Sequence, residues 1–410
     1  MKAETIFYII ITIIVLNFML EQWLSWLNDK NSSETLPDEL KGIYDEDKYA
    51  KQRAYDKVKG KFSIISSSFS FVLILLMLFF NGFAFVDDLA KSFTENAILL
   101  PLLFFAILMI ASDILTTPFS IYSTFVIEEK FGFNRTTIKT YVLDKIKGLL
   151  IGVVLGGGLM ALFIWFYNYT GEYFWLWTWG AVAVFMILIT MFYATLIVPL
   201  FNKLTPLEDG ELKEEITSYC KKVGFKLDNL FVMDGSKRSS KANAFFSGLG
   251  SKKRIVLYDT LANEYSKEEI TAVLAHEIGH YKKKHTLTSI VISIFQIGFM
   301  LFILSLVINK PEFSLALGVQ EKSFHVSLIV FSLLYSPLSM LIGIIMNIIS
   351  RKNEYEADNY AKTTYNAEPL IGSLKKLSVD SLSNLTPHPY YVFVNYSHPT
   401  LLERIKALCN

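Results

Sequence analysis

Long apolar stretches alternate with polar segments along the whole chain. A membrane-spanning helix needs about 20 mostly apolar residues to cross a hydrocarbon core about 30 Å thick. Seven stretches satisfy this requirement: residues 6–24, 62–85, 97–118, 148–167, 174–200, 286–307 and 324–350. The first is longer than the apolar part of a signal peptide and no small-residue cleavage site follows it, so we expect it to remain as a membrane helix. The pattern predicts a mostly α-helical, polytopic membrane protein with seven transmembrane helices.

Basic residues are distributed unevenly between these stretches. Residues 25–61 contain eight Lys or Arg and residues 119–147 contain five, whereas residues 86–96 contain only Lys91 and residues 168–173 contain none. Lys and Arg accumulate in cytoplasmic loops. We therefore expect the basic segments and the C-terminal segment to be cytoplasmic, and the N-terminus to lie outside the cell or in a lumen.

The spans divide the chain into four parts, two of them outside the membrane. Residues 1–200 hold spans one to five with their cytoplasmic loops, and residues 286–350 hold spans six and seven. The soluble parts are residues 201–285 and 351–410. The first soluble part is expected to be a small α+β domain with a helix and two short strands, at residues 212–223, 230–233 and 254–258.

Composition supports a membrane protein and excludes other classes. Hydrophobic residues make up 52% of the chain and charged residues 19%, and the net charge is +1. This balance gives no basic surface for nucleic acid. Cys220 and Cys409 show no metal-binding or disulfide spacing, so we expect free thiols or inert core residues.

The segment His276-Glu277-Ile-Gly-His280 carries the candidate chemistry. Residues four apart lie on one face of a helix, so both imidazoles can bind one ion. Ser266 and Glu269 fit a capping box that starts this helix. Glu277 lies beside the two histidines, where it can act as general base. The spacing predicts a catalytic zinc site with one Zn²⁺ per chain.

A catalytic zinc site needs a third protein ligand and one open position. His285 does not have the metzincin spacing, and we expect it to be an interfacial residue with Lys282–Lys284. Span seven returns to the cytoplasmic side just before Glu354, which shares a helical face with Asp358. We expect Glu354 to be the third ligand and Asp358 to hold a ligand imidazole by a hydrogen bond. Glu356 is expected to point into solvent.

Seven spans, with HExxH before the sixth and ExxxD after the seventh, resemble the type I CAAX prenyl proteases, integral-membrane zinc peptidases that process prenylated proteins. Two further segments are similar to that family. Residues 238–248 look like its stretch leading into an edge strand, and Ser397-His398-Pro399 with Arg404 looks like its C-terminal catalytic segment. The resemblance implies seven helices around an intramembrane chamber, capped on the cytoplasmic side by the zinc domain.

The resemblance also implies roles for individual residues. His398 would polarise the scissile carbonyl or steady the oxyanion, and Arg404 would orient the site. Substrate would add as a strand along an edge near residues 254–258, which assigns substrate contacts to Ile255, Val256 and Leu257. Asn243 is either a hydrogen-bond partner of that peptide or a turn residue. Asp113, within span three, is expected to line the chamber or to pair within the bundle.

Three functions can be compared on these features. The first is an endopeptidase that uses metal-activated water to cleave near the C-terminus of prenylated or other lipophilic polypeptides. The alternative is a broad-specificity protease for membrane-protein quality control, but such proteases have fewer spans. A transporter with structural zinc is disfavoured because no internal repeat is found. The expected partners are a polypeptide substrate and the lipid bilayer. The richness in Lys, Asn and Ile favours location in a bacterial inner membrane over location in the endoplasmic reticulum.

Overall fold

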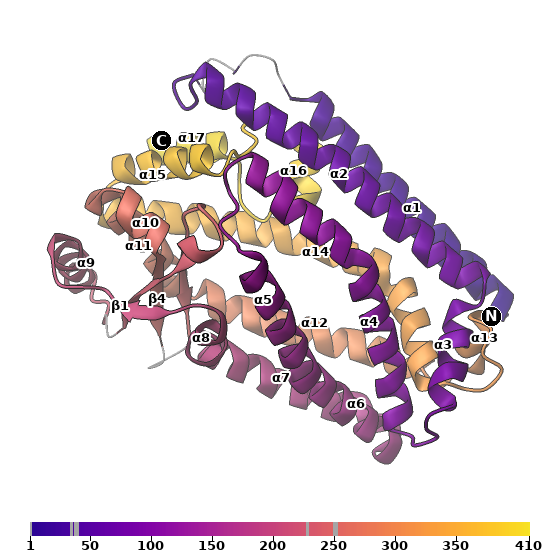
Figure 1. Ribbon diagram of the computed structural model, residues 1–410. Helices are drawn as coiled ribbons and strands as arrows, with labels where there is room; N and C mark the ends of the chain where they lie inside the picture. The colour runs from indigo at the N-terminus through magenta and orange to yellow at the C-terminus, as the bar shows by residue number, and fades with distance from the viewer. Residues whose placement is uncertain (1, 33–35, 37–40, 227–228, 249–252) are drawn as a thin grey trace.

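The computed structural model describes the chain apart from residues 1, 33–35, 37–40, 227–228 and 249–252 (Figure 1). Within the described residues, seven helical stretches are long and apolar enough to cross a membrane, which confirms the predicted number of spans. The spans are α1 (Ala3–Lys30); α2 (Glu46–Phe79); α4 (Leu99–Tyr122), continued by a π-helical turn, Ser123–Glu128; α5 (Ile138–Ile151) and α6 (Gly158–Tyr169), joined by a π-helical turn, Gly152–Gly157; α7 (Phe174–Phe192), leading into α8 (Val198–Phe201); α12 (His285–Val307); and α14 (Phe324–Thr364).

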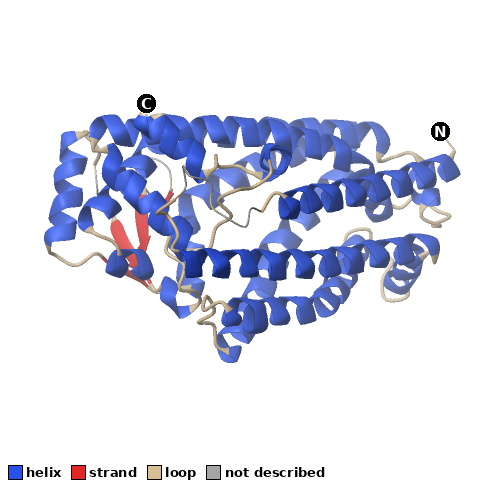
Figure 2. Ribbon diagram, turned by 90° about the horizontal axis from the view of Figure 1, so that it is seen from above, coloured by secondary structure: helices blue, strands red, loops and turns tan. Residues whose placement is uncertain are grey.

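The shorter helices lie mainly at the two ends of an elongated molecule (Figures 1 and 2). At the end that holds the N-terminus lie α3 (Gly82–Lys91) and α13 (Pro311–Ala316). The C-terminus and the sheet lie at the opposite end, together with α9 (Glu211–Lys222), α10 (Asp259–Glu264), α11 (Lys267–Lys282), α15 (Ala367–Asp380) and α17 (Leu401–Cys409). Helix α16 (Pro389–Asn395) contacts α1 and α14.

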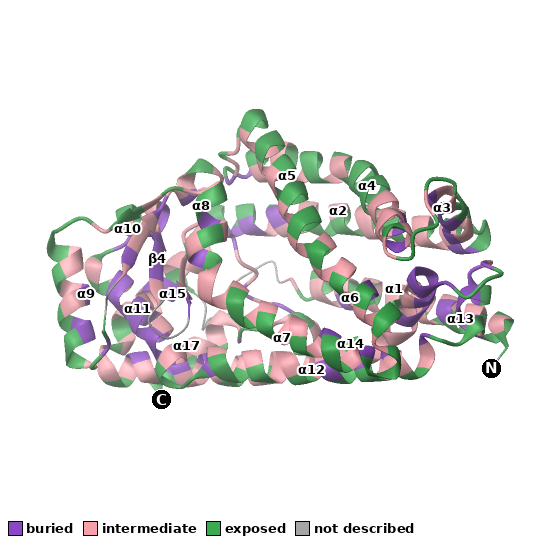
Figure 3. Cartoon of the chain, turned by 90° about the horizontal axis from the view of Figure 1, so that it is seen from below, coloured by how far each residue is buried: buried purple, intermediate pink, exposed green. Residues whose placement is uncertain are grey.

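Buried apolar side chains are concentrated at these two ends. One cluster joins the start of α1 to α3, α13 and the start of α14, and includes Ile10, Phe83 and Val330. A second cluster fills the soluble part around α9, α11 and α15. Between them the spans bury few residues: α5 buries none, and only 6–17% of each span's most apolar window is buried (Figure 3). Most side chains of the spans therefore lie outside these two buried clusters.

Among the described residues, four strands form one sheet in the order β1-β2-β4-β3. The strands are β1 (Leu204–Pro206), β2 (Leu230–Met233), β3 (Ala244–Ser247) and β4 (Arg254–Tyr258). Strands β2 and β4 are parallel, and the outer strands pair with them in antiparallel orientation. The predicted strands at 230–233 and 254–258 and the helix near 212–223 are therefore confirmed.

The prediction of a free edge along residues 254–258 is wrong. Strand β4 is paired on both sides, and Ile255, Val256 and Leu257 are at most 1% exposed. The physical reason is that Ala244–Ser247 forms a strand of its own and occupies the outer side of β4. Among the described residues, the free edge on this side of the sheet therefore belongs to β3.

Helix α11 begins at the predicted capping box. The Ser266 hydroxyl accepts a hydrogen bond from the Glu269 amide at 3.2 Å, and the Glu269 carboxylate accepts one from the Ser266 amide at 2.9 Å. These two bonds satisfy backbone donors that the first helical turn leaves unpaired. They define where the helix starts and therefore which of its residues face α14.

A glycine lets α11 and α14 approach closely. A Cβ atom built on Gly279 would lie 3.1 Å from the backbone of Ala357 and from the Cβ atom of Tyr360, both on α14. Only a residue without a side chain fits this contact comfortably. Helix α14 has 41 residues, so the span that carries Ala357 continues without interruption into the soluble part.

Candidate metal centre

The contact between α11 and α14 brings three potential ligands together. The Nε2 atoms of His276 and His280 lie 3.1 Å apart. Glu354 Oε2 lies 3.5 Å from His276 Nε2, and Glu354 Oε1 lies 3.3 Å from His280 Nε2. These side chains come from positions 276 and 280 of one helix and from a position more than 70 residues later in the chain. The predicted set of three is thus assembled at one point.

The residues present fit a zinc ion. Four ligands at about 2.05 Å in a tetrahedron are separated from one another by about 3.3 Å, which agrees with the distances of 3.1–3.5 Å among these three side chains. Two imidazoles and one carboxylate form a donor set that suits catalytic zinc and leaves a fourth position for water or substrate. Glu354 Oε2 is also buried without a well-aligned hydrogen-bond donor among the described residues.

The far side of His276 is held by charged groups. His276 Nδ1 lies 2.8 Å from Asp358 Oδ1, the contact predicted from the sequence. Arg404 of α17 donates two hydrogen bonds to the same carboxylate, from its Nε atom at 2.8 Å and from a terminal nitrogen at 2.6 Å. Arg404 therefore orients Asp358, and Asp358 in turn orients His276.

Comparisons with known proteins identify the family of this chain. Residues 25–203 match the family described as CAAX prenyl protease N-terminal, five membrane helices, and residues 206–410 match peptidase family M48. The CAAX prenyl protease 1 of Saccharomyces cerevisiae is 35% identical over 427 residues, which cover 96% of this chain and 93% of the yeast protein. The chain belongs to the CAAX prenyl protease family of M48 metallopeptidases. It is thus a membrane zinc metalloendopeptidase.

Other relatives extend this result. A CAAX prenyl protease 1 homolog from Oryza sativa is 38% identical and covers 91% of this chain and 90% of its own length. The crystal structure of S. mikatae Ste24p superposes with a TM-score of 0.94 at 35% identity, covering 99% of both chains. These relatives are eukaryotic, so they give no support to the expected bacterial source.

Glu277 is adjacent in sequence to the first histidine and is partly exposed. Restricted hydration of its carboxyl raises its pKa above the ordinary glutamate value, and His276 and His280 oppose this shift. A glutamate of raised pKa is a stronger base once it is ionised, because its conjugate acid holds the proton more tightly.

His398 faces the metal centre from the C-terminal segment. Its Nδ1 atom lies 3.0 Å from Glu354 Oε2, and 64% of its side chain is exposed. The Glu354 carboxylate raises the pKa of the His398 imidazole, although partial burial opposes that effect. His398 is thus next to the ligand set and accessible to a substrate.

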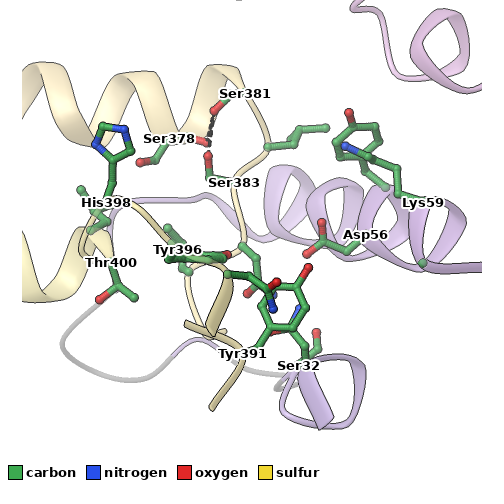
Figure 4. A pocket seen from close by; sticks show the side chains of 18 of the residues that line it. Ser32, Asp56, Lys59, Ser378, Ser381, Ser383, Tyr391, Tyr396, His398 and Thr400 are labelled. Carbon is green, nitrogen blue, oxygen red and sulfur yellow. Dashed lines mark hydrogen bonds between the residues drawn. The ribbon is translucent and has the colours of Figure 1, made fainter. Parts of the chain in front are cut away.

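A pocket of about 730 Å³, lined mainly by polar residues, opens beside His398 and Arg404. Figure 4 shows His398 and Thr400 across the pocket from Asp56 and Lys59 of α2, with Tyr396 between them. Sequence analysis did not predict this pocket, because α2 and the C-terminal segment that line it are more than 300 residues apart.

One residue lies elsewhere than expected. His285 was expected at the membrane interface with its lysine neighbours, but it is 7% exposed and its Nδ1 atom lies 3.0 Å from His280 Nδ1. Glu356 was expected in solvent and has 40% of its side chain exposed, but its Oε2 atom also lies 3.3 Å from His285 Nε2, a contact that was not predicted. A helix that continued beyond residue 283 would separate these groups, so the helical pattern alone could not predict the contact.

The remaining predicted residues lie outside the metal centre. Asn243 is exposed at the start of β3, and its side-chain oxygen accepts a hydrogen bond from the Ala244 amide at 2.8 Å. Asp113 forms an ion pair with Lys145 of α5 at 3.0 Å, so the expected pairing within the bundle is confirmed.

Proposed function

We propose that this metallopeptidase cleaves peptide bonds near the C-terminus of prenylated or other lipophilic polypeptides, with one zinc ion held by His276, His280 and Glu354. The observation that carries the proposal is the convergence of these three side chains at the ends of two spans. Helix α12, a span, begins five residues after His280, and Glu354 lies on the continuation of α14. The names of the relatives, CAAX prenyl proteases, agree with this substrate class.

The surroundings of the site favour a substrate with one polar and one apolar part. The polar pocket adjoins the metal centre through His398 and Arg404. Sparsely buried membrane helices lie on the membrane side of the centre. A polypeptide with a hydrocarbon chain next to its scissile bond can place its peptide in the first environment and its lipid in the second.

A zinc ion held by His276, His280 and Glu354 would supply Lewis acidity at the scissile carbonyl. The Glu277 carboxylate takes a proton from the attacking water and later delivers it to the leaving amine nitrogen. The His398 imidazole donates a hydrogen bond to the developing oxyanion, which contributes about 3 kcal/mol in comparable sites. Asp358 and Arg404 keep His276 in one orientation throughout.

An extended peptide is proposed to pair with the free edge of β3, in place of the edge expected at residues 254–258. Phe245 and Phe246 lie in this strand, and β3 also contacts α11. Backbone pairing of this kind holds a peptide with little selectivity for its side chains. Asn243 then lies at the end of that strand, where its amide can reach the peptide.

We also propose that residues 201–285 and 351–410 together form a cytoplasmic peptidase domain, and that the N-terminus lies on the opposite side of the membrane. Ile216, Leu274 and Leu374 belong to one buried cluster, which supports a single core for the two segments. The excess of Lys and Arg in residues 25–61 and 119–147 supports this orientation.

The test is hydrolysis of a farnesylated CAAX peptide by the purified full-length protein, compared with the unprenylated peptide and with Glu277→Gln. We expect cleavage that requires both the prenyl group and Glu277, with bound zinc retained in the variant. Equal Glu277-dependent cleavage of both peptides would replace the prenyl-substrate proposal with quality control. Zinc binding without cleavage of either peptide refutes the substrate class, and absence of both zinc and cleavage refutes the metal centre.

A further inference from the structure

The two histidines of the metal centre are supported by different groups. His276 Nδ1 faces a carboxylate directly, at 2.8 Å from Asp358. His280 Nδ1 instead faces another imidazole, at 3.0 Å from His285 Nδ1. We propose that His285 is a positioning residue for His280 and links it to the carboxylate of Glu356. This inference rests on the proposed metal centre, because it concerns how one of its ligands is oriented.

The positions of the hydrogens on the two imidazole rings support the proposal. A neutral imidazole carries one hydrogen, and the ring nitrogen that binds a metal must present its lone pair. His280 Nε2 faces His276 and Glu354, so the hydrogen of His280 must lie on Nδ1. The acceptor of that hydrogen is His285 Nδ1. His285 then carries its own hydrogen on Nε2, which lies 3.3 Å from Glu356 Oε2.

This single assignment satisfies both ring nitrogens of His285 and fixes the tautomer of His280. The hydrogen bonds then run from His280 through His285 to Glu356, and we call these three residues the relay. The negative charge of Glu356 lies at its end, where that charge makes His280 a stronger electron donor to the metal. Glu356 has 40% of its side chain exposed, and its Oε1 atom lies 3.9 Å from Lys352 Nζ.

The backbone explains how His285 reaches this position. Residues five apart on a continuous helix lie about 140° apart around its axis, so His285 would point away from His280. Helix α11 ends at Lys282, and Lys284 adopts a left-handed conformation with φ of 62°. Helix α12 then starts at His285 in a new direction. The turn between the two helices therefore directs the His285 ring back onto the metal centre.

The burial of His285 also supports a positioning role. Only 9% of the His285 side chain is exposed, so its two nitrogens must find partners within the protein. The neighbouring Lys282, Lys283 and Lys284 are exposed. A histidine that served only as an interfacial residue would share this exposure.

The experiment measures zinc affinity of the purified full-length protein by competition with a chelator, for His285→Phe and His285→Asn. Phe keeps an aromatic ring but offers no acceptor, and we expect zinc affinity to fall about 10–100-fold. Asn can present its side-chain oxygen near the position of Nδ1, so affinity within about threefold of wild type is expected. Lys283→Ala, an exposed change in the same turn, is the matched control and should bind zinc normally.

A spectroscopic readout separates ligand orientation from general damage. With Co²⁺ in place of zinc, the visible absorption bands of the Phe variant should shift, and those of the Asn and Lys283→Ala variants should match wild type. Wild-type affinity and spectrum in the Phe variant would overturn the proposal, and so would an Asn variant that is as impaired as the Phe variant.

A second variant avoids the buried position in case Phe prevents folding. Glu356→Ala changes a partly exposed side chain, and we expect it to weaken zinc binding about threefold because the relay loses its charged end. Unchanged affinity in Glu356→Ala would refute the relay. If the wild-type protein itself binds no zinc, the proposed metal centre fails and not the relay alone.

Discussion

Each buried carboxylate at the metal centre lies next to a basic side chain. Asp358 is 1% exposed and contacts both His276 and Arg404. Arg404 also lies 3.6 Å from Glu354. Removing one member of a buried ion pair costs more than the pair contributes, because the remaining charge is left without a partner.

Asp358→Asn is therefore expected to weaken zinc binding about 10–100-fold, since an amide oxygen accepts a weaker hydrogen bond from His276 than a carboxylate does. Thermal stability should fall as well, because Arg404 loses its charged partner. Chelator competition and thermal unfolding in detergent measure the two effects. Glu368→Gln, an exposed acidic position on α15, serves as control. An Asp358→Asn protein with wild-type zinc affinity would contradict the assigned role.

At the scale of elements, the position of α11 against α14 decides whether the ligands meet. The two helices contribute His276, His280 and Glu354 to one point, and Gly279 permits their contact. A Cβ atom at this position would be 3.1 Å from backbone atoms of Ala357, which cannot move without the helix. The glycine of this HExxH segment therefore contributes to the geometry of the metal centre.

We expect Gly279→Ala to destabilise the protein by about 1–3 kcal/mol, as overpacking typically does, and to reduce zinc affinity by separating the two helices. Thermal unfolding and chelator competition provide the measurements. Gly343→Ala is the matched control, because a Cβ atom there meets no atom within 4 Å although Gly343 lies on α14, the helix that Gly279 contacts. Equal behaviour of the two variants would show that the close approach has no effect on the site.

Pairing of a substrate with the edge strand β3 leads to a second prediction at this scale. The Tyr258 amide donates to the Asn243 carbonyl at 3.0 Å, so Asn243 faces β4 and the alternation of an antiparallel pair turns the backbone of Ala244 and Phe246 outward. A peptide paired with this edge uses every second amide. Methylating single backbone nitrogens of the substrate should therefore raise KM about 2–10-fold at alternate positions, the equivalent of one hydrogen bond of 0.5–1.5 kcal/mol.

The unaffected positions of the same peptide series are the internal control. Steady-state kinetics of each methylated peptide measure KM and kcat separately. A KM that changes equally at all positions, or at none, would exclude strand addition along β3.

At the scale of the whole molecule, a cluster of polar side chains links α3 to the start of α14, at the end of the molecule opposite the metal centre. Asp87 of α3 lies 2.6 Å from His325 Nε2 at the start of α14 and 2.9 Å from Lys91 Nζ. Burial acts to raise the pKa of Asp87, but His325 and Lys91 outweigh it and lower the pKa overall. A lowered pKa in the folded state means that ionised Asp87 stabilises the fold.

Asp87→Asn is expected to lower the unfolding free energy by about 1–3 kcal/mol at neutral pH, because a buried charged partner is lost. The contribution of Asp87 should be fully present above pH ~4, the ordinary aspartate pKa, and should disappear as pH falls through the lowered value. Thermal unfolding of the detergent-solubilised protein at several pH values measures this. Asp88→Asn, the exposed neighbour, should be neutral at each pH. A difference between Asp87→Asn and wild type that persists unchanged at low pH would contradict the assignment.

Local patterns in the sequence were enough to determine the spans, the helix that carries HExxH and the face shared by Glu354 and Asp358. Membrane helices require continuous apolar stretches, and ligands on one helix require a spacing of four, so both signals lie within short segments. The seven spans, the capping box at Ser266 and the convergence of the three predicted ligand side chains agree with what was expected.

Tertiary structure decided the features that depend on partners distant in sequence. Whether β4 is an edge depends on the pairing of Ala244–Ser247, and the pocket beside His398 depends on the contact of the C-terminal segment with α2. The support of His280 depends on the left-handed turn at Lys284, which directs His285 towards Glu356. Hydrophobic periodicity says nothing about such contacts, because it records which face of an element is apolar and not which element covers it.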